Sequence, residues 1–236
     1  PWASRVLAVL ALKGLTRYIS VTIVNPRLSE QGWQFGGYEG AQPDPLLNAS
    51  YMHEIYTQAD SDFTGRATVP VLWDKQQQTI VNNESADIVR MLNTAFADYT
   101  QQGPDLYPES LANDIEHWND RIYTQLNNGV YQAGFASSQQ AYDEAYDNVF
   151  TMLDELENTL SDGREYLLGN QLTETDIRLF VTLVRFDVAY YGLFKCNKKP
   201  IRDYEHLQRY MMRIYQLEGM AETVNIDHIK AGYYSI

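Results

Sequence analysis

Apolar residues recur at helical spacing through the second half of the chain. In residues 110–127 and 139–160 every third or fourth position is apolar, and this period predicts two amphipathic helices. Residues 177–191 are apolar nearly all round, which predicts a buried central helix. Shorter helices are predicted over 204–217 and 221–228. The pattern therefore predicts an all-helical second half.

The start of the central helix carries a polar signature. Thr173 and Asp176 stand three residues apart directly before the apolar run. They resemble a capping box in which aspartate replaces the usual glutamate. The central helix is therefore expected to begin close to Thr173.

The first half mixes helical and strand patterns. An apolar segment from Pro1 to Gly14 predicts a helix, because proline suits the first helical position and glycine the stop. The β-branched run 18–24 predicts a strand. The runs 69–72 and 79–81, joined by the polar residues 75–78, predict a β-hairpin.

A second helix is predicted after this hairpin. Ser85 is its candidate N-cap, and Ile88, Val89 and Leu92 lie on one face. The order helix, strand, hairpin, helix is most of a thioredoxin-like domain whose first strand is missing. A parallel crossover needs a strand before its helix as well as after it. We therefore expect that a segment precedes Pro1 in the native protein.

Three features of the first half are candidates for binding. Pro70 interrupts a strand-like run and belongs at an edge, at a bulge or in a cis peptide, which would free the backbone of Val69. The start of the Ser85 helix offers unpaired N–H groups to a carboxylate. The alternative is a purely structural hairpin and capped helix.

The long insert 25–67 shows no regular pattern, and an ordered loop of this length is usually functional. Trp33 within it either covers a ligand or pins the loop to the sheet. Arg66, near its end, either binds an anion or lies free on the surface.

Proline and glycine mark a boundary between the halves. Residues 99–108 are polar and contain Gly103-Pro104 and Tyr107-Pro108, which is typical of a linker. The predicted organisation is a thioredoxin-like α/β domain over 1–98, a linker over 99–108, and an all-α domain over 109–236.

Composition narrows the functional classes. The 236 residues carry a net charge of −13, which argues against a nucleic-acid partner or an anionic membrane surface. The single cysteine, Cys196, excludes an internal disulfide framework and suits a reducing, cytoplasmic compartment. The sequence shows no run of about 18 apolar residues, and its four histidines lack ligand-like spacing, so no metal site is predicted. Eighteen tyrosines could line a pocket for flat aromatic ligands.

A set of segments spread over nearly the whole chain carries a family resemblance. These segments are PWASR, GWQF, TVPVLWDK, IVNNESADIVRMLN, NNGVYQAGF, DIRLFVTLVRFD, YGLFKCN and TVNIDHIKAGYY. Together they resemble the Xi class of glutathione transferases, the glutathionyl-hydroquinone reductases. The resemblance implies the glutathione transferase fold, glutathione as co-substrate without a metal, and a cytoplasmic homodimer.

The resemblance also implies a nucleophile. In that family a catalytic cysteine directly precedes the Pro-Trp-Ala segment, so the thiol is expected immediately before Pro1. Ser4 stands where the family usually has histidine, which bears on the tuning of that thiol. A cysteine at a helix start has a lowered pKa, because the helix dipole favours its thiolate.

Site residues carry over from the family pattern position by position. Val69, before a cis Pro70, would bond the glutathione backbone, and Glu84 and Ser85 would hold its γ-glutamyl end. Trp33 and Arg66 would close over the rest. The resemblance also implies an aromatic site. In it, Tyr131 is the candidate proton donor, and Tyr190 and Tyr233 are further hydroquinone ligands. The adjacent Tyr191 and Tyr234 are alternatives to these two.

The implied reaction is reductive cleavage of a glutathionyl-hydroquinone. The thiolate attacks the glutathione sulfur, the hydroquinone leaves as a carbanion and takes up a proton, and a second glutathione resolves the mixed disulfide. Two alternatives remain open. One is an omega-like thioltransferase or dehydroascorbate reductase, and the other is a non-catalytic transferase-fold protein that binds ligands or partners.

Sequencing the intact N-terminus of the native protein tests the expected nucleophile. We expect a cysteine directly before Pro1. Alanine or glycine there would end the reductase hypothesis, and serine would favour conjugation or binding. A native mass equal to that of this chain alone would contradict the expectation of a preceding segment.

Overall fold

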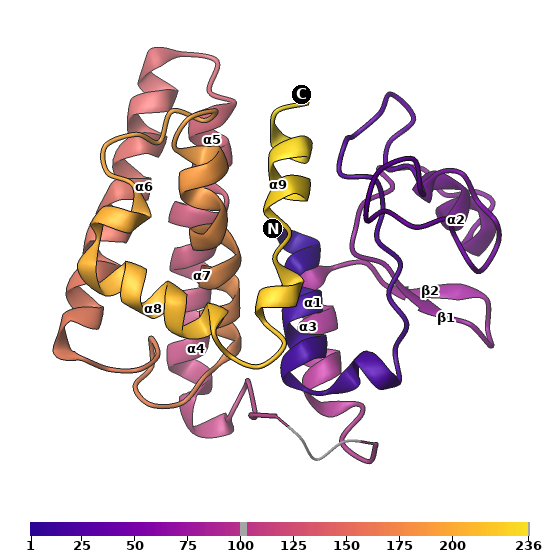
Figure 1. Ribbon diagram of the computed structural model, residues 1–236, viewed down its shortest axis with the longest axis horizontal. Helices are drawn as coiled ribbons and strands as arrows, with labels where there is room; N and C mark the ends of the chain where they lie inside the picture. Colours follow the sequence, from indigo (N-terminus) through magenta and orange to yellow (C-terminus); the bar gives the residue numbers. More distant parts are fainter. Residues whose placement is uncertain (100–102, 236) are drawn as a thin grey trace.

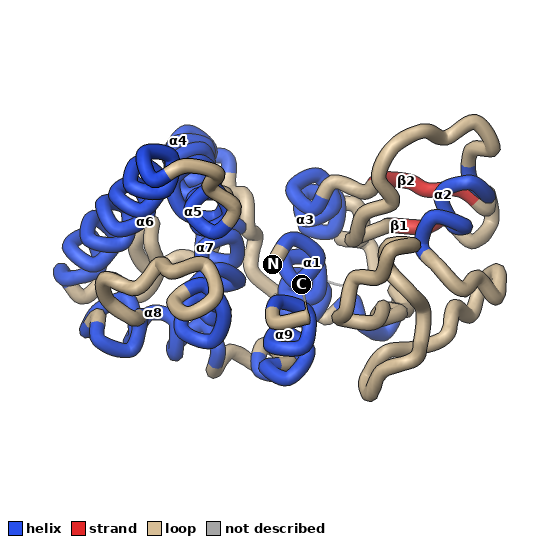
Figure 2. Tube along the Cα trace, turned by 90° about the horizontal axis from the view of Figure 1, so that it is seen from above, coloured by secondary structure: helices blue, strands red, loops and turns tan. Residues whose placement is uncertain are grey.

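The computed structural model describes residues 1–99 and 103–235. A mixed half, with the strands, lies beside a helical half, as two views at right angles show (Figure 1, Figure 2). Helices α1 (Trp2–Leu12) and α9 (Ile226–Tyr233) run between the two halves, so both ends of the described chain lie between the halves (Figure 1). No helix in the described ranges is long and apolar enough to span a membrane.

The mixed half is built on α1, a hairpin and two further helices. Its other elements are α2 (Met52–Ala59), β1 (Leu72–Asp74), β2 (Thr79–Asn82) and α3 (Ser85–Thr94). The predicted hairpin is confirmed, because β1 and β2 pair antiparallel, but its first strand lies at Leu72–Asp74 rather than at 69–72. Asp74 Oδ1 closes its turn by accepting from the N–H groups of Gln76 at 2.8 Å and Gln77 at 2.9 Å. Regular pairing begins only at Leu72, after Pro70.

The strand expected over 18–24 is not found. A strand needs a ladder of backbone partners, and within the described residues this segment forms only one bridge, from Val24 to Phe35. Gln42 bonds the backbone of Ile23 in place of a neighbouring strand, partly through its side chain. Gln42 donates its N–H to the Ile23 carbonyl at 2.8 Å, and its Oε1 accepts from the Ile23 N–H at 2.9 Å.

The insert 25–67 contains α2, which the sequence reading missed. Its buried face consists of only Met52, Ile55 and Tyr56. Three apolar positions at spacings of three and one give too short a periodic pattern to predict a helix. Glu54 stabilises the helix start, where its Oε1 accepts from the Tyr51 N–H at 2.8 Å. These residues anchor a small second core beneath the hairpin.

The second half is helical, as predicted. Its elements before α9 are α4 (Ala112–Ile122), α5 (Gly129–Gly134), α6 (Gln139–Thr159), α7 (Glu174–Arg185) and α8 (Glu205–Tyr215). The last helix was placed wrongly at 221–228. It begins at Ile226 because the Asn225 side chain caps it, accepting from the His228 N–H at 3.0 Å.

Two helices of this half end in π-helical turns. These turns span Tyr123–Asn127 after α4 and Phe186–Tyr190 after α7. In the first, the Asn128 N–H reaches the Tyr123 carbonyl at 2.9 Å, and in the second the Tyr191 N–H reaches that of Phe186 at 2.8 Å. Such i→i+5 turns inside helices are often found at functional sites.

The main core joins the two halves. Buried residues of α1 and α3 pack in one cluster with those of α4 to α9, and α1 contacts both α3 and α7. An ion-pair network adds to this junction: Arg90 of α3 bonds the buried Glu174 at 3.0 Å and Glu116 at 2.6 Å. Residues 100–102 of the expected linker 99–108 lie outside the described residues, and the domain boundaries stay a prediction.

The capping box of α7 is confirmed, with Asp176 at its centre. This fully buried carboxylate accepts from the Leu167 N–H at 2.9 Å, the Thr173 N–H at 2.8 Å, the Thr173 hydroxyl at 3.1 Å and the Tyr210 hydroxyl at 2.6 Å. Burial raises the pKa of Asp176, while these four hydrogen bonds act in the opposite direction. Asp176 thus joins the preceding loop, α7 and α8.

Removing this carboxylate should destabilise the fold in a graded way. Asp176→Ala leaves four buried donors unpaired and should lower the free energy of unfolding by about 3 kcal/mol or more. Tyr210→Phe, the matched variant, removes one of the four bonds and should cost about 1 kcal/mol. Urea denaturation measures both, and equal losses in the two variants would contradict the central role of Asp176.

Candidate functional site

The first turn of α1 is tied to both halves by Arg5, whose side chain is 2% exposed. Its Nη2 donates to Asn127 Oδ1 at 2.8 Å and its Nη1 to Ser85 Oγ at 3.4 Å. The guanidinium also lies 4.6 Å from the centroid of the Trp2 ring. Burial and then the charge of Arg178 lower the pKa of Arg5 to about 9, so the group is still positive at neutral pH.

A second buried guanidinium, Arg185, meets the same turn from α7. Its Nη2 donates to Ser4 Oγ at 2.6 Å, and its Nη1 donates to the Val181 carbonyl of its own helix at 2.7 Å. The residue is 8% exposed. The start of α1 therefore lies between two buried positive charges, Arg5 and Arg185. The sequence reading named neither, because no spacing pattern indicates them.

The cap of α3 corrects one expectation. Glu84, rather than Ser85, is the N-cap: its backbone is extended, and its Oε1 accepts from the Ala86 N–H at 3.2 Å. Asn82 holds Glu84 in place by accepting its N–H at 2.6 Å. Ser85 is the first helical residue, and its hydroxyl donates to Glu84 Oε1 at 3.3 Å. The two residues still present a carboxylate and a hydroxyl at one helix start.

The peptide between Val69 and Pro70 is cis, as expected. The N–H and carbonyl groups of Val69 make no hydrogen bond within residues 1–99 and 103–235. Tyr56 of α2 joins this segment to the α3 start. Its hydroxyl donates to the Thr68 carbonyl at 3.0 Å and accepts from Asn83 Nδ2 at 3.0 Å. Sequence reasoning missed Tyr56 because it missed α2.

Trp33 and Arg66 have different surroundings. Trp33 is half-buried and packs with Val69 against the small core of α2, and its carbonyl accepts from the Met52 N–H at 2.8 Å. Arg66 is exposed and has no hydrogen bond or ion pair to any described residue. Trp33 and Val69 thus pack against the same small core, and the Arg66 guanidinium has no hydrogen-bond or ion-pair partner among the described residues.

Three predicted tyrosines come together from three elements. The Tyr233 hydroxyl, on α9, lies 2.5 Å from that of Tyr131 on α5 and 2.8 Å from that of Tyr190 in the second π-helical turn. Burial raises the pKa of Tyr131 and of Tyr190, so both phenols stay protonated at neutral pH. We call these three residues the tyrosine cluster. The alternative Tyr234 lies outside it and is 56% exposed, and Tyr191 shares none of these bonds.

Aromatic contacts connect the tyrosine cluster to α1. The Trp2 and Tyr131 rings stack with centroids 6.3 Å apart, and Tyr131 packs edge-on against Phe194 at 5.3 Å. Gly134 makes room for Phe194, because a Cβ on this residue would lie 2.4 Å from the ring. The tyrosine cluster is therefore held from below by Phe194 and from the side by the first turn of α1.

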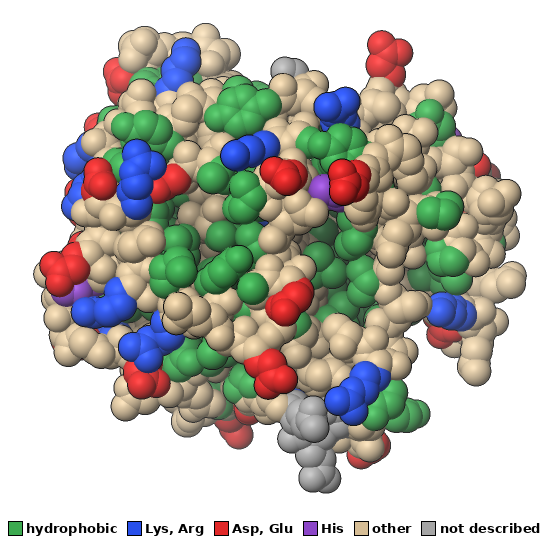
Figure 3. Space-filling model, in the orientation of Figure 1, with side chains coloured by type: hydrophobic (Ala, Val, Ile, Leu, Met, Phe, Trp, Pro, Cys, Tyr) green, Lys and Arg blue, Asp and Glu red, His purple; other side chains and the backbone are tan. Residues whose placement is uncertain are grey.

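Helix α9 is held against the mixed half at two close contacts. His228 Nε2 lies 2.5 Å from the Glu39 carbonyl, next to Gly40, where a Cβ would meet the ring at 2.8 Å. A Cβ on Gly232 would lie 2.9 Å from the Pro26 carbonyl. A cleft of about 1100 Å³, lined by residues that include Arg27 and Lys230, opens at this contact. Hydrophobic side chains gather in the hollow between the halves (Figure 3).

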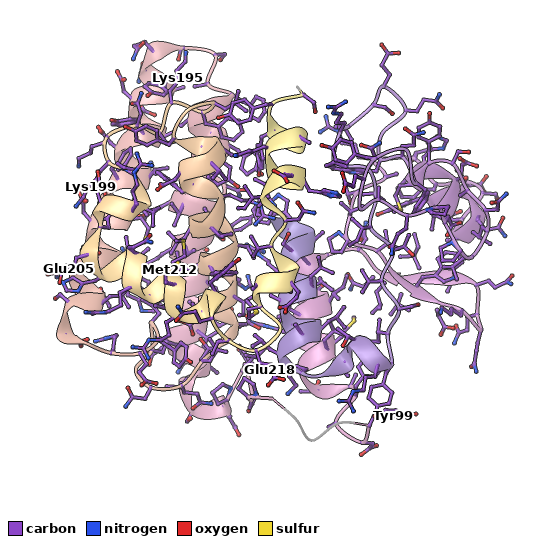
Figure 4. All side chains as sticks on the ribbon, viewed as in Figure 1. Tyr99, Lys195, Lys199, Glu205, Met212 and Glu218 are labelled. Carbon is purple, nitrogen blue, oxygen red and sulfur yellow. The ribbon has the colours of Figure 1, made fainter. Side chains whose placement is uncertain are left out.

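The site lies at the inner side of the helical half. Lys199 and Glu205 mark the opposite, outer edge of that half, while α1 and α9 run along its inner side (Figure 4). The start of α3, joined to Arg5 through Ser85, and the tyrosine cluster, joined to Trp2 through Tyr131, thus meet the beginning of α1. The arrangement can bind a peptide-like ligand on one side and an aromatic ring on the other.

Comparison with known proteins gives consistent matches. Residues 1–95 match the family model described as the glutathione S-transferase N-terminal domain, and residues 139–213 match the glutathione S-transferase C-terminal domain. The chain is 49% identical over 234 residues to glutathionyl-hydroquinone reductase PcpF of Sphingobium chlorophenolicum, covering 99% of this chain and 74% of PcpF. It is 52% identical over 235 residues to glutathionyl-hydroquinone reductase YqjG of Escherichia coli K12, covering 99% and 71%.

Solved structures agree with these relatives. The glutathione-bound structure of YqjG from Escherichia coli K-12 matches with a TM-score of 0.97 and 51% identity, covering 100% of this chain and 76% of that one. Glutathione transferase Xi 1 from Trametes versicolor matches with a TM-score of 0.96 and 47% identity, covering 100% and 83%.

The hydroxyl of Tyr233 should stabilise the folded protein more than the hydroxyl of Tyr234 does. Tyr233→Phe removes the shared partner of two buried phenols and should lower the free energy of unfolding by about 1–3 kcal/mol. Tyr234→Phe, the adjacent control, removes an exposed hydroxyl and should change it by about 0.5 kcal/mol or less. Chemical denaturation compares the two, and a Tyr233→Phe protein as stable as the control would contradict this bonding.

Proposed function

The chain belongs to the Xi class of glutathione transferases, and we propose that it reduces glutathionyl-hydroquinones to hydroquinones with glutathione as the reductant. The observation that carries this proposal is the tyrosine cluster beside the start of α1, in a chain about half identical to two proteins named for this activity. The fold is a thioredoxin-like domain followed by an all-α domain.

Glutathione is proposed to lie along the mixed half, beside Val69 and the α3 start. The free backbone groups of Val69, before cis Pro70, suit the backbone of an extended peptide. The carboxylate of Glu84 and the hydroxyl of Ser85 suit the ammonium and carboxylate of a γ-glutamyl group, and the dipole of α3 favours that carboxylate.

Trp33 and Arg66 are proposed to complete the glutathione site. Trp33 packs against the same small core as Val69, and its ring is proposed to offer an apolar wall to the ligand. The unpaired guanidinium of Arg66 suits the glycyl carboxylate, because a bidentate arginine–carboxylate pair is a strong interaction.

The nucleophile is proposed to be a cysteine directly before Pro1. Two buried guanidinium groups, those of Arg5 and Arg185, lie at the first turn of α1. Their positive charge favours a thiolate at this place, and the α1 dipole adds to it. A neutral-pH thiolate at the start of α1 is thus the expected reactive group.

The proposed reaction begins with attack of this thiolate on the sulfur of the glutathionyl-hydroquinone. A sulfur–sulfur bond forms, the bond between sulfur and the aromatic carbon breaks, and that carbon takes a proton from a tyrosine. Tyr131 is the proposed donor, because it is half-buried and stacks on Trp2, whereas Tyr190 is fully buried. Tyr190 and Tyr233 are proposed to bind the ring hydroxyls. A second glutathione then releases glutathione disulfide and restores the thiolate.

Several wider expectations belong to the same proposal. The glutathione site is assigned to residues 1–98 and the aromatic site to 109–236, joined by 99–108. We expect a homodimer, which sedimentation equilibrium would test. A cytoplasmic location is expected because the lone cysteine, Cys196, is buried and its thiol suits a reducing compartment.

Substrate choice separates this proposal from the omega-like alternative. The full-length protein should turn over glutathionyl-menadiol far faster than a small mixed disulfide such as the glutathione adduct of 2-hydroxyethanethiol. The reverse preference would favour a thioltransferase, and turnover of neither would favour a non-catalytic binding protein.

Tyr131→Phe should slow hydroquinone release while leaving glutathione binding nearly unchanged. Loss of a general acid costs about 10²-fold or more in rate, because the leaving carbon then has no positioned proton. Single-turnover kinetics with glutathionyl-menadiol measure the rate, and calorimetry measures glutathione affinity. Tyr234→Phe is the control and should keep the wild-type rate. An unaffected rate in Tyr131→Phe would remove this residue from the mechanism.

A further inference from the structure

Arg185 carries a buried positive charge without an acidic partner. Within residues 1–99 and 103–235, no carboxylate lies within ion-pairing distance of its guanidinium. Arg90 and Arg178, by contrast, both pair with the buried Glu174 at 3.0 Å. A buried charge without a counter-charge is costly, so an anion bound next to it would be stabilised.

The bonds that Arg185 does make leave this charge unneutralised. The Ser4 hydroxyl and the Val181 carbonyl are both neutral acceptors, and the Nε–H has no acceptor among the described residues. The C-terminal dipole of α7 offsets only part of the cost. The hydrogen bond to Ser4 needs only one N–H donor, which a neutral side chain could supply without a buried charge.

The position of Arg185 identifies the region where an anion is expected. Ser4, which accepts from its Nη2, lies one turn after Pro1, and the π-helical turn that follows Arg185 ends at Tyr190. Burial raises the pKa of Tyr131 and of Tyr190, and the charge of Arg185 acts on both in the opposite direction. The guanidinium therefore lies at the first turn of α1 through Ser4, and its own helix leads directly into the turn that carries Tyr190.

We propose that Arg185 is an oxyanion-binding residue, which holds one hydroxyl of the hydroquinone substrate as a phenolate. This inference rests on the proposed function and adds to it the ionisation state of the substrate. Planar guanidinium groups bind oxyanions strongly in sites from which water is excluded.

A bound phenolate makes the cleavage step easier. An aryl carbanion keeps its electron pair in the plane of the ring, where the oxygen cannot delocalise it. A phenolate instead supplies electrons to the ring, so the carbon bearing sulfur can take the tyrosine proton first and form a dienone. Attack of the thiolate on sulfur then breaks the carbon–sulfur bond, and its electron pair returns through the ring to the oxygen.

The charges balance in this sequence, and no outside oxidant is required. The thiolate sulfur is oxidised to the mixed disulfide, and the ring carbon is reduced from a carbon–sulfur to a carbon–hydrogen bond. The tyrosinate takes its proton back from water, and the product leaves once the phenolate is protonated. Arg185 stabilises the oxyanion before and after the cleavage.

The probe for this site is 4-nitrophenol, which is colourless as the phenol and yellow as the phenolate. Absorbance titration of the full-length protein with this compound gives the pKa of the bound probe without any turnover. We expect the wild-type protein to bind the phenolate about tenfold more tightly than the phenol, which lowers the pKa of the bound probe by about one unit. Arg185→Gln should abolish that shift, and Arg185→Lys should keep most of it.

Arg209→Gln is the matched control. It removes the same charge from α8, whose first residue, Glu205, lies at the outer edge of the helical half (Figure 4), and it should keep the wild-type shift. If Arg185→Gln does not fold, the wild-type shift and the Arg185→Lys variant still test the proposal. It is overturned if wild-type protein binds only the neutral phenol or no probe, if Arg185→Gln retains the shift, or if Arg185→Lys folds and loses it.

Activity measurements separate this inference from the proposed function. In single turnover of glutathionyl-menadiol, Arg185→Gln should lower the rate by about 10²-fold or more, with glutathione affinity unchanged by calorimetry. A wild-type protein that shifts the probe but does not cleave the conjugate would contradict the proposed function and leave the oxyanion site supported. Cleavage with unchanged rate in Arg185→Gln would overturn the role of Arg185 alone.

Discussion

The buried charge of Arg5 is the constraint on which the site depends. A guanidinium that is 2% exposed must keep its hydrogen-bond acceptors, and those of Arg5 come from different halves: Ser85 begins α3, and Asn127 ends the first π-helical turn. Because Arg5 lies in the first turn of α1, the start of that helix is fixed relative to both. The start of α3 and the tyrosine cluster are thereby both held close to the beginning of α1.

Periodicity predicted the helical half well, because its helices are long and bury one broad face. The same reasoning failed where a segment has the composition of a strand but finds no partner strand. Residues 18–24 have strand composition, yet a strand is a property of two segments, and Val24 alone finds a bridge. Helix α2 was missed because eight residues with three apolar positions give little periodic signal. Its absence from the prediction made the insert look irregular.

Site residues that belong to a sequence motif could be predicted. Residues that matter through their three-dimensional contacts could not. The family pattern predicted Val69, Glu84, Ser85 and the tyrosines as site residues, and the structure brings Tyr131, Tyr190 and Tyr233 together. The sequence favoured Ser85 as the N-cap of α3 and the structure uses Glu84, since both side chains can accept hydrogen bonds. The sequence gave no sign of Arg185, because the lack of an ion-pairing carboxylate among the described residues is known only from its three-dimensional neighbours.

The second π-helical turn, Phe186–Tyr190, makes the aromatic site sensitive to the deletion of a single residue, whereas the fold would tolerate that deletion. A π-helical turn holds one more residue between its bonded groups than an α-helical turn. Deletion of a single residue within Phe186–Tyr190 would let α-helical bonding continue, but it would rotate every later residue by about 100° around the axis. The apolar face of α7 before Arg185 would stay packed, while Tyr190 would turn away from Tyr233. Within this family, a one-residue gap at this place in an alignment would therefore mark a relative that keeps the fold but has rebuilt its aromatic site.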